Sequence, residues 1–261
     1  MRYVLRTLAL GWLAAVLVLP VGLVLWRTFE PGPGDVWASV TTPAAISAFW
    51  LTLEVAAIAV ALNVVLGVGT ALLLVRGRLR PAVRATLDAL IDLPFAVSPV
   101  VVGLSLILLY GRGGWLADLP FDVIFSLPGI VLATVFVCVP FVVREVVPVL
   151  LEVGDEQEQA AATLGASPWQ AFRRITLPAI RWGVAYGVVL STARALGEFG
   201  AVSVVSGKVA GETQTLTLLV EERFQNFDLA GAYAASALLA LIAIATLLAT
   251  TVLGSRKDDC A

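Results

Sequence analysis

Two charged side chains, Arg194 and Glu198, lie deep inside a strongly apolar segment that runs from Pro178 to Ser206. Charges in such a segment are costly and mark either a function or a compensating partner. Residues four apart share one face of a helix, so the two side chains can form an ion pair. Pairing is favoured for Glu198, because a carboxylate repels anions. For Arg194 two roles stay open, a structural ion pair or a positive site along the path of an anion.

The same segment carries a surface of small residues beside these charges. Gly197 and Gly200 lie beside Ala193 and Ala201, and small side chains let helices approach closely within a membrane. The sequence therefore predicts helix packing at this surface. The neighbouring helix can belong to this chain or to another subunit.

A second patterned stretch, EQAAATLGASPWQAFRRITLPAI, occupies residues 158–180. Residues 157–164 are rich in alanine and contain no helix breaker, which predicts a short helix. Gly165 can end that helix, because glycine adopts the left-handed conformation that helix ends often need. Ser167 and Pro168 are typical of the cap and the first position of a second helix. The pattern predicts an exposed helical hairpin between two apolar regions.

The elements around these residues must be membrane helices. Of 261 residues, 59% are hydrophobic and 14% are charged, and the mean hydropathy is +0.95. A water-soluble domain could not cover so much apolar surface. A net charge of −2 with dispersed basic residues gives no indication of nucleic-acid binding. We expect an all-α membrane protein embedded in lipid.

Several kinds of chemistry are excluded by the residue types. The chain has no histidine, which removes histidine-based metal sites and Ser-His or Cys-His catalysis. Cys138 and Cys260 are far apart, so a disulfide framework is not expected. No G-x-x-x-x-G-K-[ST] phosphate-binding loop is present. We therefore expect no metal site, no ATP site and no enzymatic activity in this chain.

Six apolar runs approach the roughly 20 residues that a spanning helix needs. The first is too long for a signal peptide and no cleavage site follows it, so we expect it to be retained. The fifth is unusual because it contains the two charges described above. The predicted spans are 7–26, 55–75, 93–110, 123–143, 178–206 and 229–255.

Lysine and arginine predict the orientation, because they are retained in short cytoplasmic loops. With the N-terminus inside, twelve of them fall on the cytoplasmic side and four outside, a clear bias that also places the C-terminus and the hairpin inside. The twelve are Arg2, Arg6, Arg76, Arg78, Arg80, Arg84, Arg144, Arg173, Arg174, Arg181, Arg256 and Lys257, and the four are Arg27, Arg112, Lys208 and Arg223.

The third predicted span holds further polar and bent positions. Asp88 and Asp92 lie near its inner end, where they can cap the helix or pair with Arg84. Pro94 and Pro99 are expected to kink it and to release a backbone carbonyl.

The spacing of the hairpin closely resembles the EAA loop of ABC importer permeases. The match comprises Ala160-Ala161, Gly165 after three residues, and Ile175-x-Leu177-Pro178 after nine more. The resemblance implies a coupling helix that docks on a cytoplasmic ATPase. The family's glutamate aligns with Gln159, one residue after Glu158, which puts a peripheral ion pair in doubt. The implied coupling residues are Glu158, Gln159, Ala160, Ala161, Gly165, Ala166, Ser167 and Pro168.

A second resemblance narrows the class. The stretches STARALGEFGAVSVVSG (191–207) and GETQTLTLLVEE (211–222) are similar to the W-type sulfate permeases of this superfamily. Molybdate permeases share an ARALGEFGA-like segment and usually diverge after it. The similarity extends from about residue 48 onward. The resemblance implies import of sulfate, with thiosulfate and molybdate or tungstate as alternatives.

The resemblance also implies an architecture and partners. We expect a type I ABC importer permease of six transmembrane helices in the inner membrane, with both termini cytoplasmic. Its parts would be a first span and outer loop (1–47), a permease core (48–253) with the coupling loop at 152–178, and a short cytoplasmic tail (254–261). The partners would be a second, related permease, two copies of an ATPase that bind ATP and Mg²⁺, and an external sulfate-binding protein.

A secondary transporter or channel driven by an ion gradient is the alternative from another class. Such a protein would be expected to carry several intramembrane carboxylates or a pair of broken, repeat-related helices. One charged span is recognisable in this sequence, which favours the ATP-driven class.

Overall fold

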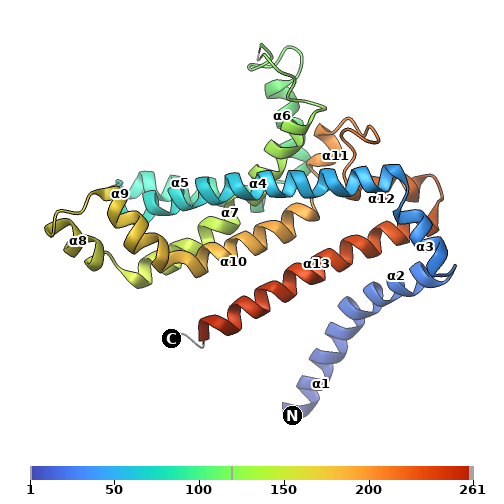
Figure 1. The fold of residues 1–261 in the computed structure, drawn as a ribbon, viewed down its shortest axis with the longest axis horizontal. Helices are drawn as coiled ribbons and strands as arrows, with labels where there is room; N and C mark the ends of the chain where they lie inside the picture. The colour runs from blue at the N-terminus through green and yellow to red at the C-terminus, as the bar shows by residue number, and fades with distance from the viewer. Residues whose placement is uncertain (1, 119, 259–261) are drawn as a thin grey trace. The chain divides into compact units, whose positions relative to one another are not determined.

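A computed structural model of the chain describes residues 2–118 and 120–258, and within them every regular element is helical (Figure 1). Residues 259–261, which include Cys260 and the end of the predicted tail, lie outside the described residues, as do Met1 and position 119. The elements are α1 (Arg2–Leu13), the π-helical η1 (Ala14–Val18), α2 (Leu19–Phe29), α3 (Pro33–Val40), α4 (Pro43–Arg76), α5 (Pro81–Ala96), α6 (Pro99–Tyr110), α7 (Leu127–Val153), α8 (Glu156–Thr163), α9 (Pro168–Ala171), the π-helical η2 (Phe172–Thr176), α10 (Leu177–Leu196), α11 (Val202–Val205), α12 (Leu216–Gln225) and α13 (Leu229–Asp258).

The chain forms two compact units. The terminal unit comprises residues 1–52 and 208–244, and the central unit comprises residues 53–207 and 245–261. The hairpin and the Arg194–Glu198 segment both belong to the central unit.

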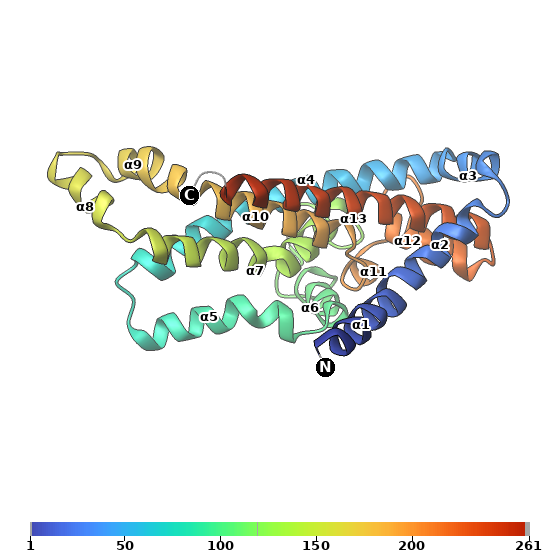
Figure 2. The ribbon, with the colours of Figure 1, turned by 90° about the horizontal axis from the view of Figure 1, so that it is seen from below.

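The central unit is held by close packing of α4, α7 and α10. A Cβ on Gly67 of α4 would lie 2.7 Å from Cβ of Val142 in α7. A Cβ on Gly187 of α10 would lie 2.9 Å from Cα of Val142, and one on Gly183 would lie 2.9 Å from the carbonyl oxygen of Glu145. Because these glycines have no side chain, α4 and α10 can approach α7 closely. Close packing holds the helices together, since lipid provides no hydrophobic driving force between them. Figures 1 and 2 both show α7 and α10 side by side.

The predicted third span is broken rather than kinked. Helices α5 and α6 meet at an angle of 109°. Pro94 lies inside α5, whereas Pro99 stands in the first turn of α6, where its missing N–H is tolerated. Beyond the break, α6 packs on α11, because a Cβ on Gly103 would lie 2.8 Å from Cβ of Val204.

The aspartates of this region pair with α7 and not with Arg84. Arg144 donates from Nε to Oδ1 of Asp92 at 2.9 Å, and its Nη1 lies 3.7 Å from Oδ1 of Asp88. The expected pairing with Arg84 is therefore wrong, because α5 turns this face toward α7. The ion pairs tie α5 to α7.

The terminal unit has its own core and polar ties. Its buried residues include Ala45, Leu216 and Ala235, which come from α4, α12 and α13. Arg223 of α12 donates to the carbonyl oxygens of Ser39 and Gly231 at 3.0 and 3.1 Å. Helix α3, α12 and the start of α13 are thereby joined within this unit.

Four helical segments of the described residues are long and apolar enough to cross a membrane, and the bent pair α5–α6 would be a fifth if it counts as one span. The predicted number of six therefore depends on α10 and stays a prediction. The fifth predicted span is also shorter than expected, since α10 ends at Leu196 instead of continuing to Ser206. The four segments are Leu5–Phe29, Pro43–Arg76, Leu127–Val153 and Leu229–Thr246.

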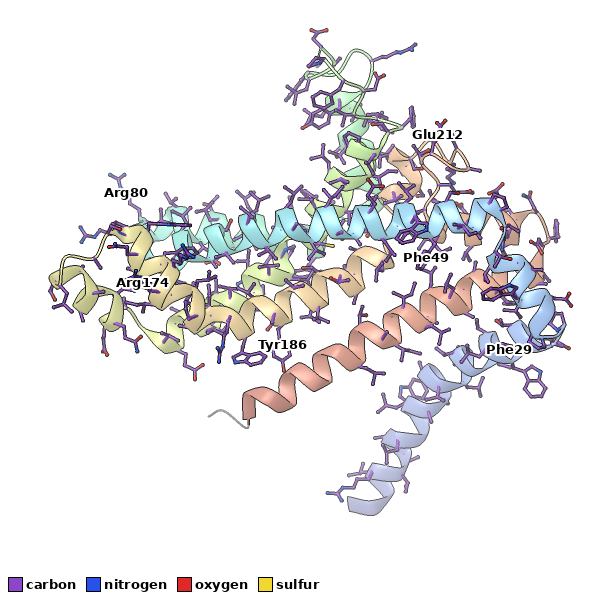
Figure 3. The ribbon with its side chains drawn as sticks, in the orientation of Figure 1. Phe29, Phe49, Arg80, Arg174, Tyr186 and Glu212 are labelled. Carbon is purple, nitrogen blue, oxygen red and sulfur yellow. The ribbon has the colours of Figure 1, made fainter. Side chains whose placement is uncertain are left out.

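Two of the basic residues predicted to be cytoplasmic lie at the same end of the central unit. Figure 3 places Arg80, between α4 and α5, and Arg174, in η2, at the end that carries α8 and α9. This agrees with the assignment of both residues to one side of the membrane. The orientation itself, with both termini inside, stays a prediction.

Candidate functional site

The predicted hairpin is present with the predicted turn chemistry. Helix α8 ends at Thr163, and Gly165 has a φ of +84°, the left-handed conformation expected of it. Ser167 caps α9: the Gln170 N–H donates to Oγ of Ser167 at 3.3 Å, and the Ser167 N–H donates to Oε1 of Gln170 at 2.8 Å. This reciprocal pair is a capping box. Helix α9 then continues through η2 into α10 without a break.

The hairpin presents an exposed surface at one end of the central unit (Figure 2). Leu164 is 88% exposed and Trp169 is 67% exposed, and the Trp169 ring stacks on Phe172 with centroids 5.5 Å apart. Exposed apolar side chains at a helical turn outside the apolar spans offer surface that a partner can bury. Of the predicted coupling residues, Gln159, Ala160, Gly165, Ser167 and Pro168 are exposed, and Ala161 and Ala166 are half-buried.

Glu158 differs from the other predicted coupling residues because its carboxylate turns inward. Arg76, the last residue of α4, donates from Nε to Oε2 of Glu158 at 3.1 Å. Thr176, the last residue of η2, donates from Oγ1 to Oε1 at 2.8 Å. In the sequence Arg76 is one of twelve predicted cytoplasmic charges, and no pattern indicates Thr176 as a partner of Glu158. The two contacts span 82 and 18 positions, so no local sequence pattern indicates either role.

Arg194 and Glu198 form the predicted ion pair. Nη2 of Arg194 lies 2.6 Å from Oε2 of Glu198, and the Ala201 N–H donates to Oε1 of the same carboxylate at 2.8 Å. The Glu198 side chain is 1% exposed and that of Arg194 is 32% exposed. Glu198 lies two residues beyond the end of α10, so the pair closes a turn instead of lying along a continuous helix. The carboxylate is an internal anchor, and the guanidinium keeps one open side.

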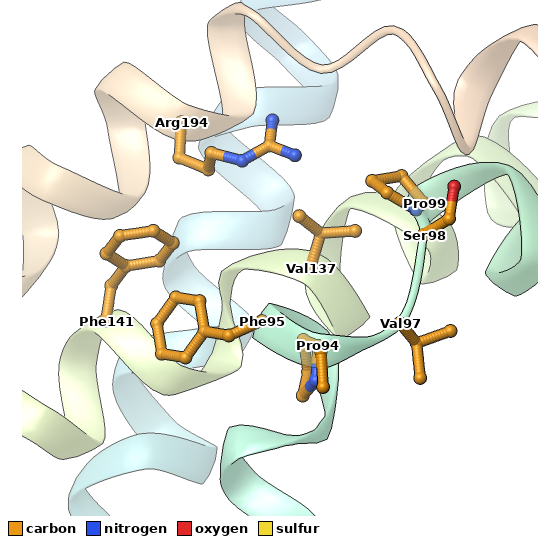
Figure 4. A pocket seen from close by; sticks show the side chains of 9 residues that line it. Pro94, Phe95, Val97, Ser98, Pro99, Val137, Phe141 and Arg194 are labelled. Atoms are coloured by element: carbon orange, nitrogen blue, oxygen red, sulfur yellow. The ribbon is translucent and has the colours of Figure 1, made fainter.

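That open side borders a cavity of about 420 Å³ at the break between α5 and α6 (Figure 4). Residues 94–99 line one wall, and Val137 and Phe141 of α7 line another. In Figure 4 the guanidinium of Arg194 points toward Val137 and Pro99. Arg194 is the one charged side chain among the described residues that line this cavity. The two prolines indicated a bend, but no sequence pattern indicated that the bend would face Arg194.

The two glycines beside the pair have different environments. A Cβ on Gly200 would lie 2.9 Å from Cβ of Pro99, so this glycine permits close contact with the start of α6. Gly197 instead ends α10, and among the described residues a Cβ there would meet only the carbonyl oxygen of Ala193, at 3.8 Å. The packing expected at Gly200 is present within the chain, and that expected at Gly197 is not seen there.

The described residues contain no group of three or more His, Cys, Asp or Glu side chains that could hold a metal ion. The arrangement offers a docking surface, a guanidinium facing a cavity, and ion pairs that join helices.

Comparison with known proteins assigns the class. Residues 63–258 match the family described as "Binding-protein-dependent transport system inner membrane component". The chain belongs to this family: it is a multi-pass inner-membrane permease component of such a transport system, and not the ATPase.

Individual relatives of the chain include sulfate transport system permease proteins. The chain is 47% identical to the sulfate transport system permease protein CysW of Synechocystis sp., over 98% of this chain and 93% of that protein. It is 47% identical to CysW of Escherichia coli K12 (94% of this chain, 85% of that protein). It is 40% identical to the sulfate transport system permease protein CysT of the same bacterium (93% and 88%).

The fold has a solved counterpart. A crystal structure of a bacterial ABC transporter involved in the import of the acidic polysaccharide alginate matches with a TM-score of 0.79, over 97% of this chain and 94% of that one. The sequences are 17% identical, so this likeness concerns the fold. The chain has the all-helical permease fold of ABC importers.

Proposed function

We propose that this chain is a permease subunit of an ATP-driven importer of sulfate. The identity of 47% to two CysW proteins, against 40% to a CysT protein, favours the W-type role. Thiosulfate fits the same class of oxyanion and is included in the proposal. Molybdate or tungstate is the alternative substrate, because molybdate permeases share part of the 191–207 stretch.

We propose that the hairpin transmits the energy of ATP hydrolysis from the ATPase to this chain. The observation that carries this proposal is an exposed, capped helix–turn–helix with small residues on α8 and bare apolar side chains at Leu164 and Trp169. A surface of this kind accommodates a close-fitting partner, since small side chains allow approach and exposed apolar groups gain from burial. The partner would be a cytoplasmic ATPase, which would also bind the ATP and Mg²⁺.

The complete importer would contain further subunits. We assign a related but different second permease to the partner position, because both W-type and T-type relatives exist. Two ATPase copies and an external sulfate-binding protein complete the assembly, in keeping with the binding-protein-dependent family. Six spans with both termini in the cytoplasm would place the hairpin where the ATPase can reach it.

The cavity beside Arg194 is the proposed segment of the anion path in this chain. A guanidinium presents several N–H donors in a planar fork that suits oxyanions. Glu198 takes up one side of that fork and leaves the other toward the cavity. A neutralised, partly open guanidinium would allow a dianion to pass without trapping it, since a path must bind weakly enough to release its solute.

Uptake by cells tests the substrate and the coupling together. In Escherichia coli lacking its own CysW, this chain together with its cognate second permease, ATPase and binding protein should restore ATP-dependent uptake of radioactive sulfate. Gly165→Asp should abolish uptake while membrane levels stay normal, because Asp is strained at a φ of +84° and places a charge on the docking surface.

The matched control is Gly113→Asp, which adds the same charge at a similar φ of +82°, in an exposed segment between α6 and α7 that belongs neither to the hairpin nor to its contacts. Uptake of molybdate without sulfate would overturn the substrate assignment. Uptake that continues after deletion of the ATPase would overturn the ATP-driven mechanism.

A further inference from the structure

We infer that Arg76 is a positioning residue for energy coupling, the joint through which the hairpin moves α4 and α10 as well as α7. The inference rests on the proposed function, because it assigns a role in coupling to residues that do not touch the docking partner. Its evidence is that the guanidinium of Arg76, at the end of α4, binds both the end of α7 and Glu158 of α8, and that Thr176, ahead of α10, donates to the same carboxylate.

The guanidinium of Arg76 is almost fully engaged. It donates to Glu158 of α8 from Nε at 3.1 Å and from Nη2 at 3.4 Å. It also donates from Nη1 to the carbonyl oxygen of Leu150 at 3.3 Å and from Nη2 to the carbonyl oxygen of Gly154. The side chains of Arg76 and Glu158 are 20% and 23% exposed. A partly buried fork with two carboxylate and two carbonyl acceptors is a fixed joint, in contrast to a loose surface ion pair.

The carbonyl acceptors belong to the end of α7, where backbone oxygens have no partner inside the helix. An arginine at that position satisfies them and complements the negative end of the helix dipole. Arg76 therefore binds the end of α7 and the start of α8 at the same time.

Gly154 explains why such a joint is needed. It connects α7 to α8 with a φ of +69°, and a Cβ there would meet no atom within 4 Å. A glycine in open space has little to restrain its dihedral angles. Without the hydrogen bond from Arg76 to the carbonyl oxygen of Gly154, α8 could rotate about Gly154 and would transmit little movement to α4 and α10.

Thr176 extends the joint to the helix that carries Arg194. Thr176 is 5% exposed, donates to Glu158 at 2.8 Å, and immediately precedes α10. A displacement of α8 would thus reach α4 through Arg76 and α10 through Thr176. Because Gln159, at the position of the family's glutamate, is exposed and uncharged, the inward carboxylate of Glu158 serves the joint and not the docking surface.

The test compares Arg76→Met with Arg78→Met in the complete complex, reconstituted in proteoliposomes with its second permease, ATPase and binding protein. Arg78 is exposed two residues further along and is the matched control. We expect Arg76→Met to lower the sulfate imported per ATP hydrolysed by about threefold to tenfold, while ATP hydrolysis continues. Arg76→Lys should lie between the two, since one ammonium cannot reach all four acceptors.

A structural measurement separates this inference from the proposed function. Amide hydrogen exchange of residues 154–165 should become faster in Arg76→Met and stay unchanged in Arg78→Met. Unchanged exchange together with an unchanged stimulation of ATP hydrolysis by the binding protein would overturn the inference, even if the solute were not sulfate. A wild-type complex that hydrolyses ATP but imports no sulfate would overturn the proposed substrate, and the exchange and stimulation measurements would still decide the role of Arg76.

Discussion

The central unit contains two arginine–glutamate pairs that differ in almost every physical respect. Arg194 and Glu198 are four residues apart, close one turn, and bury the carboxylate to 1% exposure. Arg76 and Glu158 are 82 positions apart, join α4 to α8, and are each about one-fifth exposed. The first pair fixes a single side chain beside a cavity, whereas the second ties whole helices together at the hairpin.

The burial of an ion pair determines how much stability is lost on mutation, whereas the number of elements that the pair joins determines how movement is transmitted. Removing one partner of a buried pair leaves an uncompensated charge, which is costly for stability. Removing one partner of a partly exposed pair that spans several elements lets water replace the lost contacts, but it frees those elements from one another. We therefore expect the Arg194 pair to govern stability and the Arg76 pair to govern transmission of movement.

The largest stability effect should follow from Arg194→Met. This change leaves the buried carboxylate of Glu198 without its cation, and breaking such pairs typically costs about 3–5 kcal/mol. The free energy of unfolding in mixed detergent micelles measures it. The double variant Arg194→Met/Glu198→Gln should recover most of the loss, because the amide oxygen can still accept from Ala201. A loss below about 1 kcal/mol in the single variant would remove the contrast between the two pairs.

Helix α10 lies between the two pairs, and its packing on α7 provides the next test. In Gly187→Ala the new Cβ would lie 2.9 Å from Cα of Val142, so backbone must shift. Overpacking of this kind costs about 1–3 kcal/mol. Gly69→Ala is the matched control, since a Cβ at Gly69 meets nothing within 4 Å. Thermal unfolding of both variants measures the difference, and equal midpoints would contradict the proposed contact of α10 with α7.

What could be predicted from the sequence was local. The hairpin, the left-handed Gly165, the cap at Ser167 and the ion pair at Arg194 all depend on residues fewer than five positions apart. Such features follow from backbone conformation and helix geometry, which neighbouring residues determine. The class of protein was also accessible, through apolar composition and the spacing of the hairpin residues.

What could not be predicted depends on distant segments. The pairing of Asp92 with Arg144, and of Arg76 with Glu158, requires knowing which helix faces share an interface. The angle of 109° between α5 and α6 likewise accompanies the packing of α6 on α11, and prolines indicate only that a break is permitted. The cavity beside Arg194 lies at that break, so it could not be predicted from the sequence either.

A double-mutant cycle sharpens the comparison of the two pairs directly. Using Arg76→Met and Glu158→Gln, we expect a coupling energy of about 1 kcal/mol, in the range for pairs that water partly reaches. The cycle for Arg194 and Glu198 should give a clearly larger value, because the Glu198 carboxylate has almost no contact with solvent. Reversible unfolding of the purified chain measures both cycles. Equal coupling energies would show that exposure does not distinguish the pairs.

The smallest effect should come from the cap of α9, which lies on the hairpin but outside the Arg76 joint. Ser167→Ala removes the acceptor for the Gln170 N–H, and loss of a helix cap typically costs about 1 kcal/mol. The loss should appear as faster amide exchange in residues 168–171 with little change in residues 154–158, because Arg76 and Glu158 hold that part independently. Ser167→Thr keeps a hydroxyl acceptor and should behave like the unmodified chain. If exchange rose equally across the hairpin, the hairpin would be one cooperative unit, and the Arg76 joint would not be separable from the surface that it is proposed to move.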